Sequence, residues 1–410
     1  MKKILLINPN SYANPPVPPI GLEYIASALE DNGYEVDFLD LFFSCSKENY
    51  DSKIKQSDYI CITFRNLDTC CFLDSESFIE QLKIRVSYIK ANSDAVVVLG
   101  GVGFSIAPEE ILDYCGADYG IVGQGENALL YLLKNRNTVS QRILYGENFE
   151  GYRNTHQRKF VNYSKYIKLG STLGVTTHFG CKEVCSYCVE GRKREMERSI
   201  TNVMDEIKQL RQYGSNFMFC DSEFNSDIEL RMELMQQLIE QKMDISYYAY
   251  LKPENISERF VEMLAKSGGY GVSIGLDTMH EEGKVILNKK YTTEQIEDCF
   301  QLLNQYQISF VPSFIVGFPW DTIEMIEEGV KFCEKNHAKM TSVNVGVRVY
   351  PNTEFCNYIM KDYKKNEDKF YGAKTNNAQL LKPLYYMNDR KLLNSVMELR
   401  RKYNISIPGC

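Results

Sequence analysis

The sequence lacks the features that would place it at a membrane or on nucleic acid. No segment reaches eighteen consecutive apolar residues, so there is no candidate membrane span. No run of five or six basic residues occurs, and the formal net charge is −7 at pH 7, which disfavours a surface for a phosphate backbone. The first apolar run is only four residues long, so we interpret it as a strand rather than a signal peptide. We therefore expect a cytoplasmic protein without nucleic-acid or membrane partners.

Histidine is also scarce, whereas cysteine is not. The four histidines are at positions 156, 178, 280 and 337, so the first 155 residues contain none. Thirteen cysteines in a chain of 410 residues without a signal peptide indicate reduced thiols and metal ligation in the cytosol rather than disulfides. We interpret ten of them as small buried apolar residues, and Cys410 receives no role from the sequence.

Three cysteines stand apart because they lie within eight residues, as Cys181, Cys185 and Cys188. Three thiolates from one loop can hold three irons of an iron–sulfur cube and leave the fourth iron without a protein ligand. The alternatives are a chance grouping or a structural zinc site with His178 as the fourth ligand. Zinc sites usually draw two ligand pairs from separate turns, so the single loop favours a cluster.

Strand and helix patterns alternate through the first 145 residues. Short β-branched runs at 4–7, 34–39, 59–63 and 95–99 are separated by helical stretches such as 75–91. This alternation predicts an α/β domain, a doubly wound parallel sheet of Rossmann-like type, in residues 1–145. Ligands of such sheets bind beyond the carboxyl ends of the strands.

The alternation returns after an aperiodic linker at 146–169 and continues through 170–364. The expected strands of this second region are Leu173–Thr177, Asn216–Cys220, Ser246–Leu251, Gly271–Gly275, Ser309–Val316 and Val343–Val349. Helical patterns lie between them, and residues 365–410 form a C-terminal element with one helical stretch at 389–403. We expect the catalytic and ligand-binding residues in the loops that follow the strands.

The pattern C-x-x-x-C-x-aromatic-C, with Tyr187 as the aromatic residue, resembles the radical S-adenosylmethionine (SAM) enzymes over Thr172–Phe355. The resemblance implies a partial (β/α)6 barrel and a [4Fe-4S] cluster bound by the three cysteines. It also implies that the open iron binds the amino and carboxylate groups of SAM. The zinc site and the chance grouping remain the alternatives that the residues themselves leave open.

Further segments carry the same resemblance at the expected strand ends. Asp221, Ser222 and Glu223 resemble the segment that faces the SAM amino group, and Lys252 stands where a basic residue often meets the carboxylate. Gly275–Thr278 resembles a Gly-(Ile/Leu)-Glu-Ser segment with Asp in place of Glu, and Leu287–Thr292 fits the same pattern. The implied SAM-binding residues are Tyr187, Asp221, Ser222, Glu223, Lys252, Asp277, Gly317 and Pro319. Each segment has a plainer interpretation, because Asp, Ser and Thr after strands are common helix caps and Gly-x-Pro is a common turn.

The first 134 residues resemble the cobalamin-binding domain found in front of many radical SAM modules. The resemblance rests on Pro15–Tyr24 and on two glycine-rich loops, where glycine lets the backbone approach a bulky ligand. The implied cobalamin-binding residues are Arg65, Asn66, Gly100, Gly101, Ser105, Gly123, Gly125 and Glu126.

The domain departs from one form of that family, which supplies a histidine to cobalt from Asp-x-His-x-x-Gly. No histidine of this domain can ligate cobalt. Arg65 is a candidate for the lower cobalt face, where a cation without a lone pair would discourage a sixth ligand and favour heterolytic methyl loss. Equally, Arg65 could pair with Asp68.

These patterns predict a cobalamin-dependent radical SAM enzyme, most readily a C-methyltransferase acting on a small-molecule or peptide substrate. The family chemistry implies SAM cleavage to a 5′-deoxyadenosyl radical, methyl transfer from methylcobalamin, and an electron donor such as flavodoxin or ferredoxin. The alternatives are a rearrangement or cyclisation with the same cofactors, polar methyl transfer to an sp2 carbon, and an iron–sulfur electron-transfer or sensor protein. The last predicts a fourth cluster ligand, and no fourth cysteine lies nearby.

Overall fold

The computed structural model describes residues 2–10, 12, 16–191 and 194–409. The chain forms two compact units: unit 1 comprises Met1–Asp68, Ser77–Phe179 and Met196–Gly214, and unit 2 comprises Thr69–Glu76, Gly180–Glu195 and Ser215–Cys410. Pro15 and Cys410, both named above, lie outside the described residues.

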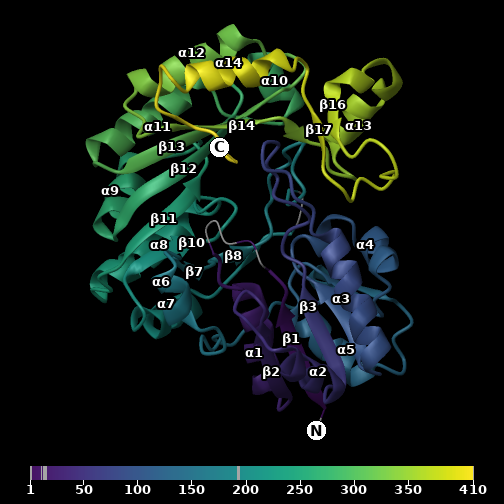
Figure 1. Ribbon diagram of the computed structural model, residues 1–410. Helices are drawn as coiled ribbons and strands as arrows, with labels where there is room; N and C mark the ends of the chain where they lie inside the picture. The colour runs from purple at the N-terminus through teal and green to yellow at the C-terminus, as the bar shows by residue number, and fades with distance from the viewer. Residues whose placement is uncertain (1, 11, 13–15, 192–193, 410) are drawn as a thin grey trace. The chain divides into compact units, whose positions relative to one another are not determined.

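Unit 1 is built on a six-stranded parallel sheet with the strand order β2-β1-β3-β4-β5-β6 (Figure 1). The β1 segment Ile4–Ile7 is fully buried, as a strand covered on both faces requires. Helix α1 packs against α5, and α3 packs against α2 and α4, so helices accompany the sheet in two groups, as expected for a doubly wound fold. The bounds are β1 Lys3–Asn8, α1 Ile20–Asp31, β2 Glu35–Asp40, α2 Lys47–Lys55, β3 Tyr59–Thr63, α3 Ile79–Asn92, β4 Val96–Gly100, η1 Phe104–Ile106, α4 Pro108–Cys115, β5 Tyr119–Val122, α5 Glu126–Asn135 and β6 Ile143–Tyr145.

The segment predicted as a linker is more ordered than its aperiodic sequence indicates. It contains a short helix, α6, and its residues His156 and Arg158 are almost completely buried. The remaining elements of unit 1 follow it. They are η2 Gly146–Asn148, α6 Tyr163–Lys168, β7 Leu173–Val175, β8 His178–Phe179, β9 Met196–Glu197 and α7 Ile200–Arg211.

Unit 2 repeats the alternation of strand and helix. Its parallel strands lie in the order β18-β14-β13-β12-β11-β10 and do not close into a barrel, and α9, α11 and α12 lie on their outer side (Figure 1). Five of the six strands predicted for the second region are present, although the first of them, β7, is counted with unit 1. The bounds are β10 Asn216–Phe219, α8 Ile228–Glu240, β11 Ser246–Leu251, α9 Glu258–Lys266, β12 Gly269–Asp277, α10 Glu281–Ile286, α11 Thr293–Gln305, β13 Ser309–Val316, α12 Ile323–Lys335 and β14 Thr341–Val345.

The prediction of one continuous strand over Val343–Val349 is wrong. Gly346 has φ +84°, a left-handed conformation that ends β14 and turns the chain into β15. Strand β15 joins a separate antiparallel sheet in the order β15-β17-β16, so the C-terminal element contains strands as well as the predicted helix. The bounds are β15 Val347–Arg348, α13 Glu354–Met360, η3 Tyr363–Lys365, η4 Glu367–Lys369, β16 Phe370–Gly372, β17 Leu384–Tyr386, α14 Lys391–Leu399 and β18 Ile405–Ser406.

Hydroxyl and carboxylate caps fix where the helices of unit 2 begin. Asp227, Ser257, Thr292 and Thr322 each accept a hydrogen bond from a backbone N–H in the first turn of the helix that follows. These caps place the helix starts directly after the loops at the strand ends. In the part of the chain that the structure describes, none of the helices has the length and apolar character needed to cross a membrane.

Candidate active site

The three cysteines of the loop are free thiols that lie near one another in unit 2. Cys181 is buried, and Cys185 and Cys188 are partly buried. Burial, with smaller contributions from Glu223, Cys188 and Cys185, raises the pKa of Cys181 to about 12. The thiols are therefore protonated at neutral pH when no metal is bound, and metal binding must release their protons.

The loop fits an iron–sulfur cluster better than a single metal ion. The backbone N–H of Glu190 donates to Cys188 Sγ at 3.4 Å, and hydrogen bonds to sulfur are one way in which proteins tune such clusters. Among the described residues, no three His, Cys, Asp or Glu side chains are arranged to hold one ion. Cysteine ligands of a cubane bind different irons, so their sulfurs need not converge on one point. The geometry thus gives no support to the zinc alternative.

The predicted SAM-binding residues of unit 2 follow the carboxyl ends of adjacent strands. Asp221, Ser222 and Glu223 follow β10, Lys252 follows β11, and Asp277 ends β12. Gly317 and Pro319 follow β13, and Tyr187 lies in the cysteine loop itself. Since these strands are parallel neighbours, their carboxyl ends share one edge of the sheet.

Two of these side chains are held by acidic residues near the cysteines. Lys252 Nζ donates to Glu183 Oε1 at 2.5 Å, and Ser222 Oγ donates to Glu190 Oε2 at 3.1 Å. Burial would raise the pKa of Glu183, but Lys252 lowers it below its usual value, so this carboxylate is ionised. Sequence reasoning missed Glu183 and Glu190 as partners, although Glu183 lies within the cysteine loop and Glu190 only two residues beyond it.

Two buried oxygens in unit 2 have no hydrogen-bond partner among the described residues, namely Glu223 Oε2 and Ser186 Oγ. Burial raises the pKa of Glu223 to about 7, although Lys289 and Lys252 lower it. A buried polar atom without a partner costs free energy unless a ligand or water completes it. An ammonium group such as that of SAM would satisfy the Glu223 carboxylate.

Asp277 is engaged by two other residues of the site. Tyr187 Oη donates to Asp277 Oδ2 at 2.7 Å, and Lys289 Nζ forms an ion pair with the same oxygen. The ring of Tyr187 also lies beneath Lys289, with 5.7 Å between Nζ and the ring centroid. Asp277 therefore connects the cysteine loop to Lys289, a residue that the sequence indicated only through the Leu287–Thr292 pattern.

The loop after β13 is fixed by backbone contacts. Gly317 has φ +122°, and Asp321 Oδ2 accepts hydrogen bonds from the N–H groups of Gly317 and Phe318 at 2.7 and 2.9 Å. Burial raises the pKa of Asp321 to about 6. Trp320 stacks on Phe318 with ring centroids 5.0 Å apart, and Pro319 is exposed. The loop thus presents Pro319 while Trp320 packs within the unit.

In unit 1, the predicted cobalamin loops are bonded to one another. Gly103 N donates to Arg65 O at 2.8 Å, and a Cβ on Gly101 would lie 2.8 Å from Phe64 O. Ser105 Oγ accepts from Gly123 N at 3.2 Å. The structure therefore brings together the loops after β3, β4 and β5 that contain Arg65, Asn66, Gly100, Gly101, Ser105, Gly123 and Gly125.

Arg65 is exposed, and a cavity of about 40 Å³ lies beside it, lined also by Asn66, Asn10 and Arg85. Glu126 differs from the other predicted residues because it is buried at the start of α5 and lies 3.0 Å from His156 Nε2. Its carboxylate is thus directed into the interior of unit 1.

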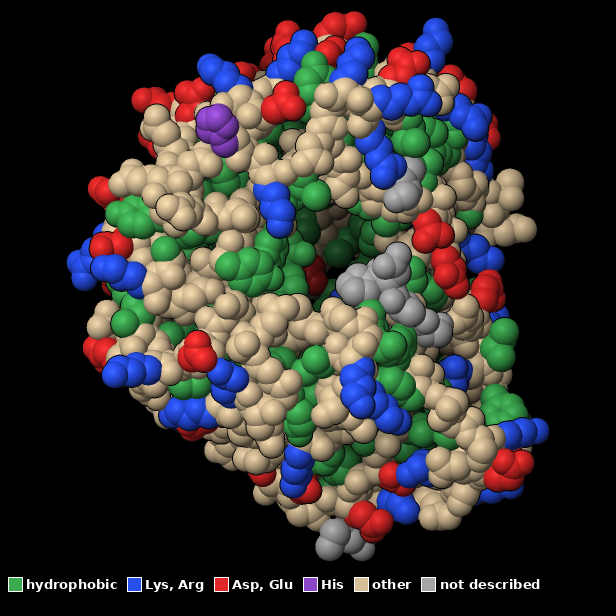
Figure 2. Space-filling view, turned by 60° about the vertical axis from the view of Figure 1, so that its left-hand side comes forward, with side chains coloured by type: hydrophobic (Ala, Val, Ile, Leu, Met, Phe, Trp, Pro, Cys, Tyr) green, Lys and Arg blue, Asp and Glu red, His purple; other side chains and the backbone are tan. Residues whose placement is uncertain are grey.

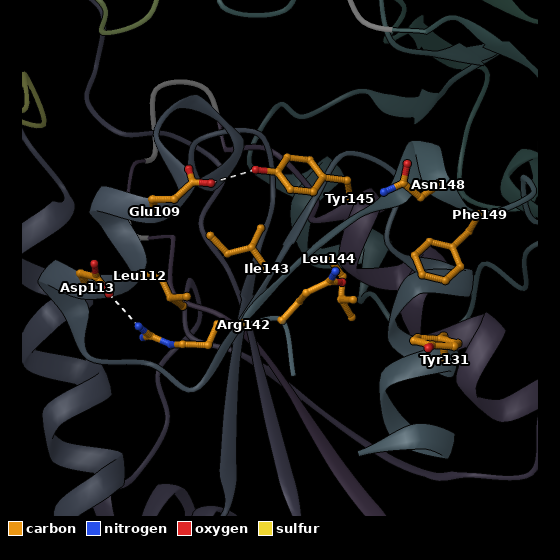
Figure 3. A pocket seen from close by; sticks show the side chains of 11 residues that line it. Glu109, Leu112, Asp113, Tyr131, Arg142, Ile143, Leu144, Tyr145, Asn148 and Phe149 are labelled. Carbon is orange, nitrogen blue, oxygen red and sulfur yellow. Dashed lines mark hydrogen bonds and ion pairs between the residues drawn. The ribbon is translucent and has the colours of Figure 1, made fainter. Parts of the chain in front are cut away.

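A second cavity, of about 630 Å³, runs along the edge strand β6 (Figure 3). Glu109 and Asp113 of α4 line one side of it, and Tyr131 lines the other. Tyr145 donates to Glu109 at 2.9 Å, and Arg142 pairs with Asp113 at 2.7 Å. None of the predicted cobalamin residues lines this cavity, so we assign it no part in the reaction.

Comparison with known proteins identifies two regions of the chain. Residues 11–133 match the family model of the B12 binding domain, and residues 175–333 match that of the Radical SAM superfamily. A tryptophan 2-C-methyltransferase from Streptomyces laurentii is 26% identical, over 85% of this chain and 73% of its own length. An uncharacterized methyltransferase from Pyrococcus horikoshii is 24% identical, over 88% of this chain and 83% of its own length.

Solved structures show the same fold over the whole chain. The radical SAM methyltransferase TsrM from Kitasatospora setae, with cobalamin and a [4Fe-4S] cluster bound, superposes with a TM-score of 0.89 at 22% identity. That match covers 100% of this chain and 93% of TsrM. The cobalamin-dependent SAM radical enzyme OxsB superposes with a TM-score of 0.73 at 14% identity, over 98% of this chain and 66% of its own.

Proposed function

Since this chain belongs to the cobalamin-dependent radical SAM enzymes, we propose that it is a C-methyltransferase that methylates a small molecule. The observation that carries the proposal is the pairing of two sites in one chain. Three free cysteines share one loop of unit 2, and three loops at the strand ends of unit 1 are hydrogen-bonded to one another. The relatives named above are themselves methyltransferases by name.

When bound, SAM would supply the methyl group, cobalamin would carry it, and the cluster would supply the electrons that keep cobalamin reduced. The chain supplies the binding contacts. Cys181, Cys185 and Cys188 would hold the cluster, and Glu223 and Lys252 would bind the amino and carboxylate groups of SAM. The buried Glu223 Oε2, which has no hydrogen-bond partner among the described residues, supports the contact with the amino group. The glycine loops after β4 and β5 hold cobalamin by close backbone approach.

We expect the accepting carbon to be trigonal, as in an aromatic ring. Arg65 is exposed on the loop after β3, and the first 155 residues contain no histidine to ligate cobalt. If Arg65 faces bound cobalamin, its cation has no lone pair to donate to cobalt, which would favour loss of the methyl group as a cation to a nucleophilic carbon. The 2-C position named for the Streptomyces laurentii relative is a trigonal carbon of the indole ring.

We also propose that a small iron–sulfur or flavin protein supplies the electrons. Nucleic acid is not expected as a partner, because lysine, arginine, aspartate and glutamate are interspersed on the face shown in Figure 2. The net charge of −7 also disfavours binding to a phosphate backbone.

The test is anaerobic reconstitution of the full chain with iron, sulfide and cobalamin, followed by incubation under reducing conditions, which convert cobalamin to cob(I)alamin, with SAM and tryptophan or other small aromatic compounds. We expect S-adenosylhomocysteine and a product heavier by one methyl group, without stoichiometric 5′-deoxyadenosine. Stoichiometric 5′-deoxyadenosine alongside a methylated product would indicate radical methylation instead. Formation of 5′-deoxyadenosine with an unmethylated product would indicate a rearrangement or cyclisation, and no SAM turnover at all would contradict the proposal.

A further inference from the structure

The turn at the end of α10 is bonded to the cysteine loop. Ser186 N donates to Leu287 O at 3.2 Å, and Asn288 Nδ2 donates to Val184 O at 2.9 Å. Asn288 has φ +58°, a left-handed conformation that Asn adopts more readily than most residues. These bonds fix the backbone of the next residue, Lys289, beside the cluster ligands.

Lys289 directs its ammonium group into this loop. It pairs with Asp277, hydrogen bonds to the Cys185 thiol and lies over the ring of Tyr187, and its side chain is only 11% exposed. The ion pair with Asp277 thus holds a positive charge, shielded from solvent, against a cluster ligand.

Asp277 supplies the negative charge opposite Lys289, and the local backbone conformation sets the direction of its side chain. The pairing of β12 with β13 shifts register between Gly275 and Asp277, and Asp277 has φ +61°. Such a bulge turns a side chain away from the regular strand direction. Asp277 is 5% exposed and receives the Tyr187 hydroxyl at 2.7 Å. It is thus held between the aromatic residue of the cysteine loop and Lys289.

We propose that Lys289 and Asp277 are positioning residues that set the reduction potential of the cluster bound by Cys181, Cys185 and Cys188. The cluster becomes more negative when it accepts an electron from the donor protein, so the Lys289 ammonium stabilises the reduced form. Asp277 opposes this effect and holds the ammonium in place. Net charge and hydrogen bonds to sulfur are established determinants of cluster potentials. The inference rests on the cluster of the proposed function and adds a role for two residues of this chain.

The test is the midpoint potential of the cluster in the full chain, reconstituted with iron and sulfide and titrated at pH 8 without SAM. Electron paramagnetic resonance of the reduced cluster is the readout. Lys289→Met should make reduction at least tenfold less favourable, a shift of about 59 mV to more negative potential for one electron. Asp277→Asn should shift the potential in the positive direction, and the double variant should return close to the original value.

Potential shifts of opposite sign in the two single variants distinguish electrostatic tuning from structural damage, because damage to the structure would not depend on the sign of the charge removed. Lys289→Arg keeps the charge and should leave the potential unchanged, as should the control Lys290→Met, because Lys290 is exposed and its charge is screened. Shifts of the same sign in the two single variants, or shifts no larger than in the control, would overturn the inference. If Lys289→Met binds no cluster, the Asp277→Asn variant tests the inference alone: a shift to more positive potential supports it, and a shift to more negative potential overturns it. Failure of the unaltered protein to bind any cluster would instead reject the proposed function.

Discussion

A buried charge network in unit 1 should make the stability of the protein depend on one glutamate of α7. Glu206 is fully buried and accepts hydrogen bonds from Arg158 at 3.0 Å and Tyr24 at 2.9 Å, and it also binds His156 and Arg198. Burial would raise the pKa of Glu206, but His156, Arg198 and Arg158 together lower it from 4.5 to about 2. The carboxylate is therefore strongly favoured in the folded state.

The substitution Glu206→Gln removes this charge and turns one acceptor into a donor that faces other donors. A drop of about 2.5 pKa units corresponds to about 3 kcal/mol of unfolding free energy, at about 1.4 kcal/mol per unit. Because the folded pKa is the lower one, this stability is present above pH 4.5 and is lost as the pH falls toward 2. We therefore expect Glu206→Gln to cost about 3 kcal/mol at pH 7, and the difference from the unaltered protein to shrink below pH 4.5.

The assay is urea denaturation followed by circular dichroism from pH 7 down to pH 3. The control is Asp205→Asn, one position earlier on α7, where the carboxylate is partly exposed and lies 3.6 Å from Lys208. An exposed pair of this kind contributes at most about 1 kcal/mol. A Glu206→Gln variant as stable at pH 7 as Asp205→Asn would refute the reasoning, as would a destabilisation that does not change with pH.

Four further outcomes follow from the site. Cys185→Ala should abolish cluster absorbance and iron binding, and a full cluster in this variant would reject the ligand set. Arg65→His introduces a lone-pair donor, so the spectrum of bound cobalamin should change to that of a ligated cobalt; an unchanged spectrum would place Arg65 away from the metal. Glu223→Gln should weaken SAM binding at least tenfold, and in the unaltered protein affinity should rise as the pH passes about 7, because deprotonation of Glu223 supplies the negative charge that an ammonium group needs. Gly101→Ala, with a Cβ 2.8 Å from Phe64 O and φ +101°, should reduce cobalamin retention, which gel filtration with absorbance detection would measure.

The sequence predicted features that depend on local pattern. The spacing of Cys181, Cys185 and Cys188 is a local property, and so is the alternation of β-branched runs with helical periodicity. These patterns predicted β1 to β4 of unit 1 and the positions of the strands β10 to β14 of unit 2, but not β5 and β6. The C-terminal strands β16 and β17 were missed because each is only three residues long and depends on strand pairing, not on its own periodicity: β17 pairs with both β15 and β16.

Features that depend on tertiary contacts could not be read from the sequence. The polar segment around His156 and Arg158 resembles a solvated linker, yet its charges are neutralised by Glu23, Glu126 and Glu206 from distant positions. Asp277 matched a SAM-binding pattern, but its contacts with Tyr187 and Lys289 follow from a strand bulge and a left-handed backbone conformation. Sequence spacing alone does not show which way such a side chain points.

The most direct test of the central claim is methyl transfer from SAM labelled with deuterium in its methyl group, with and without cobalamin. The account predicts a small-molecule product that carries the three deuterium atoms on carbon, formed only when cobalamin and the cluster are both present. A labelled product formed equally well without cobalamin would contradict it.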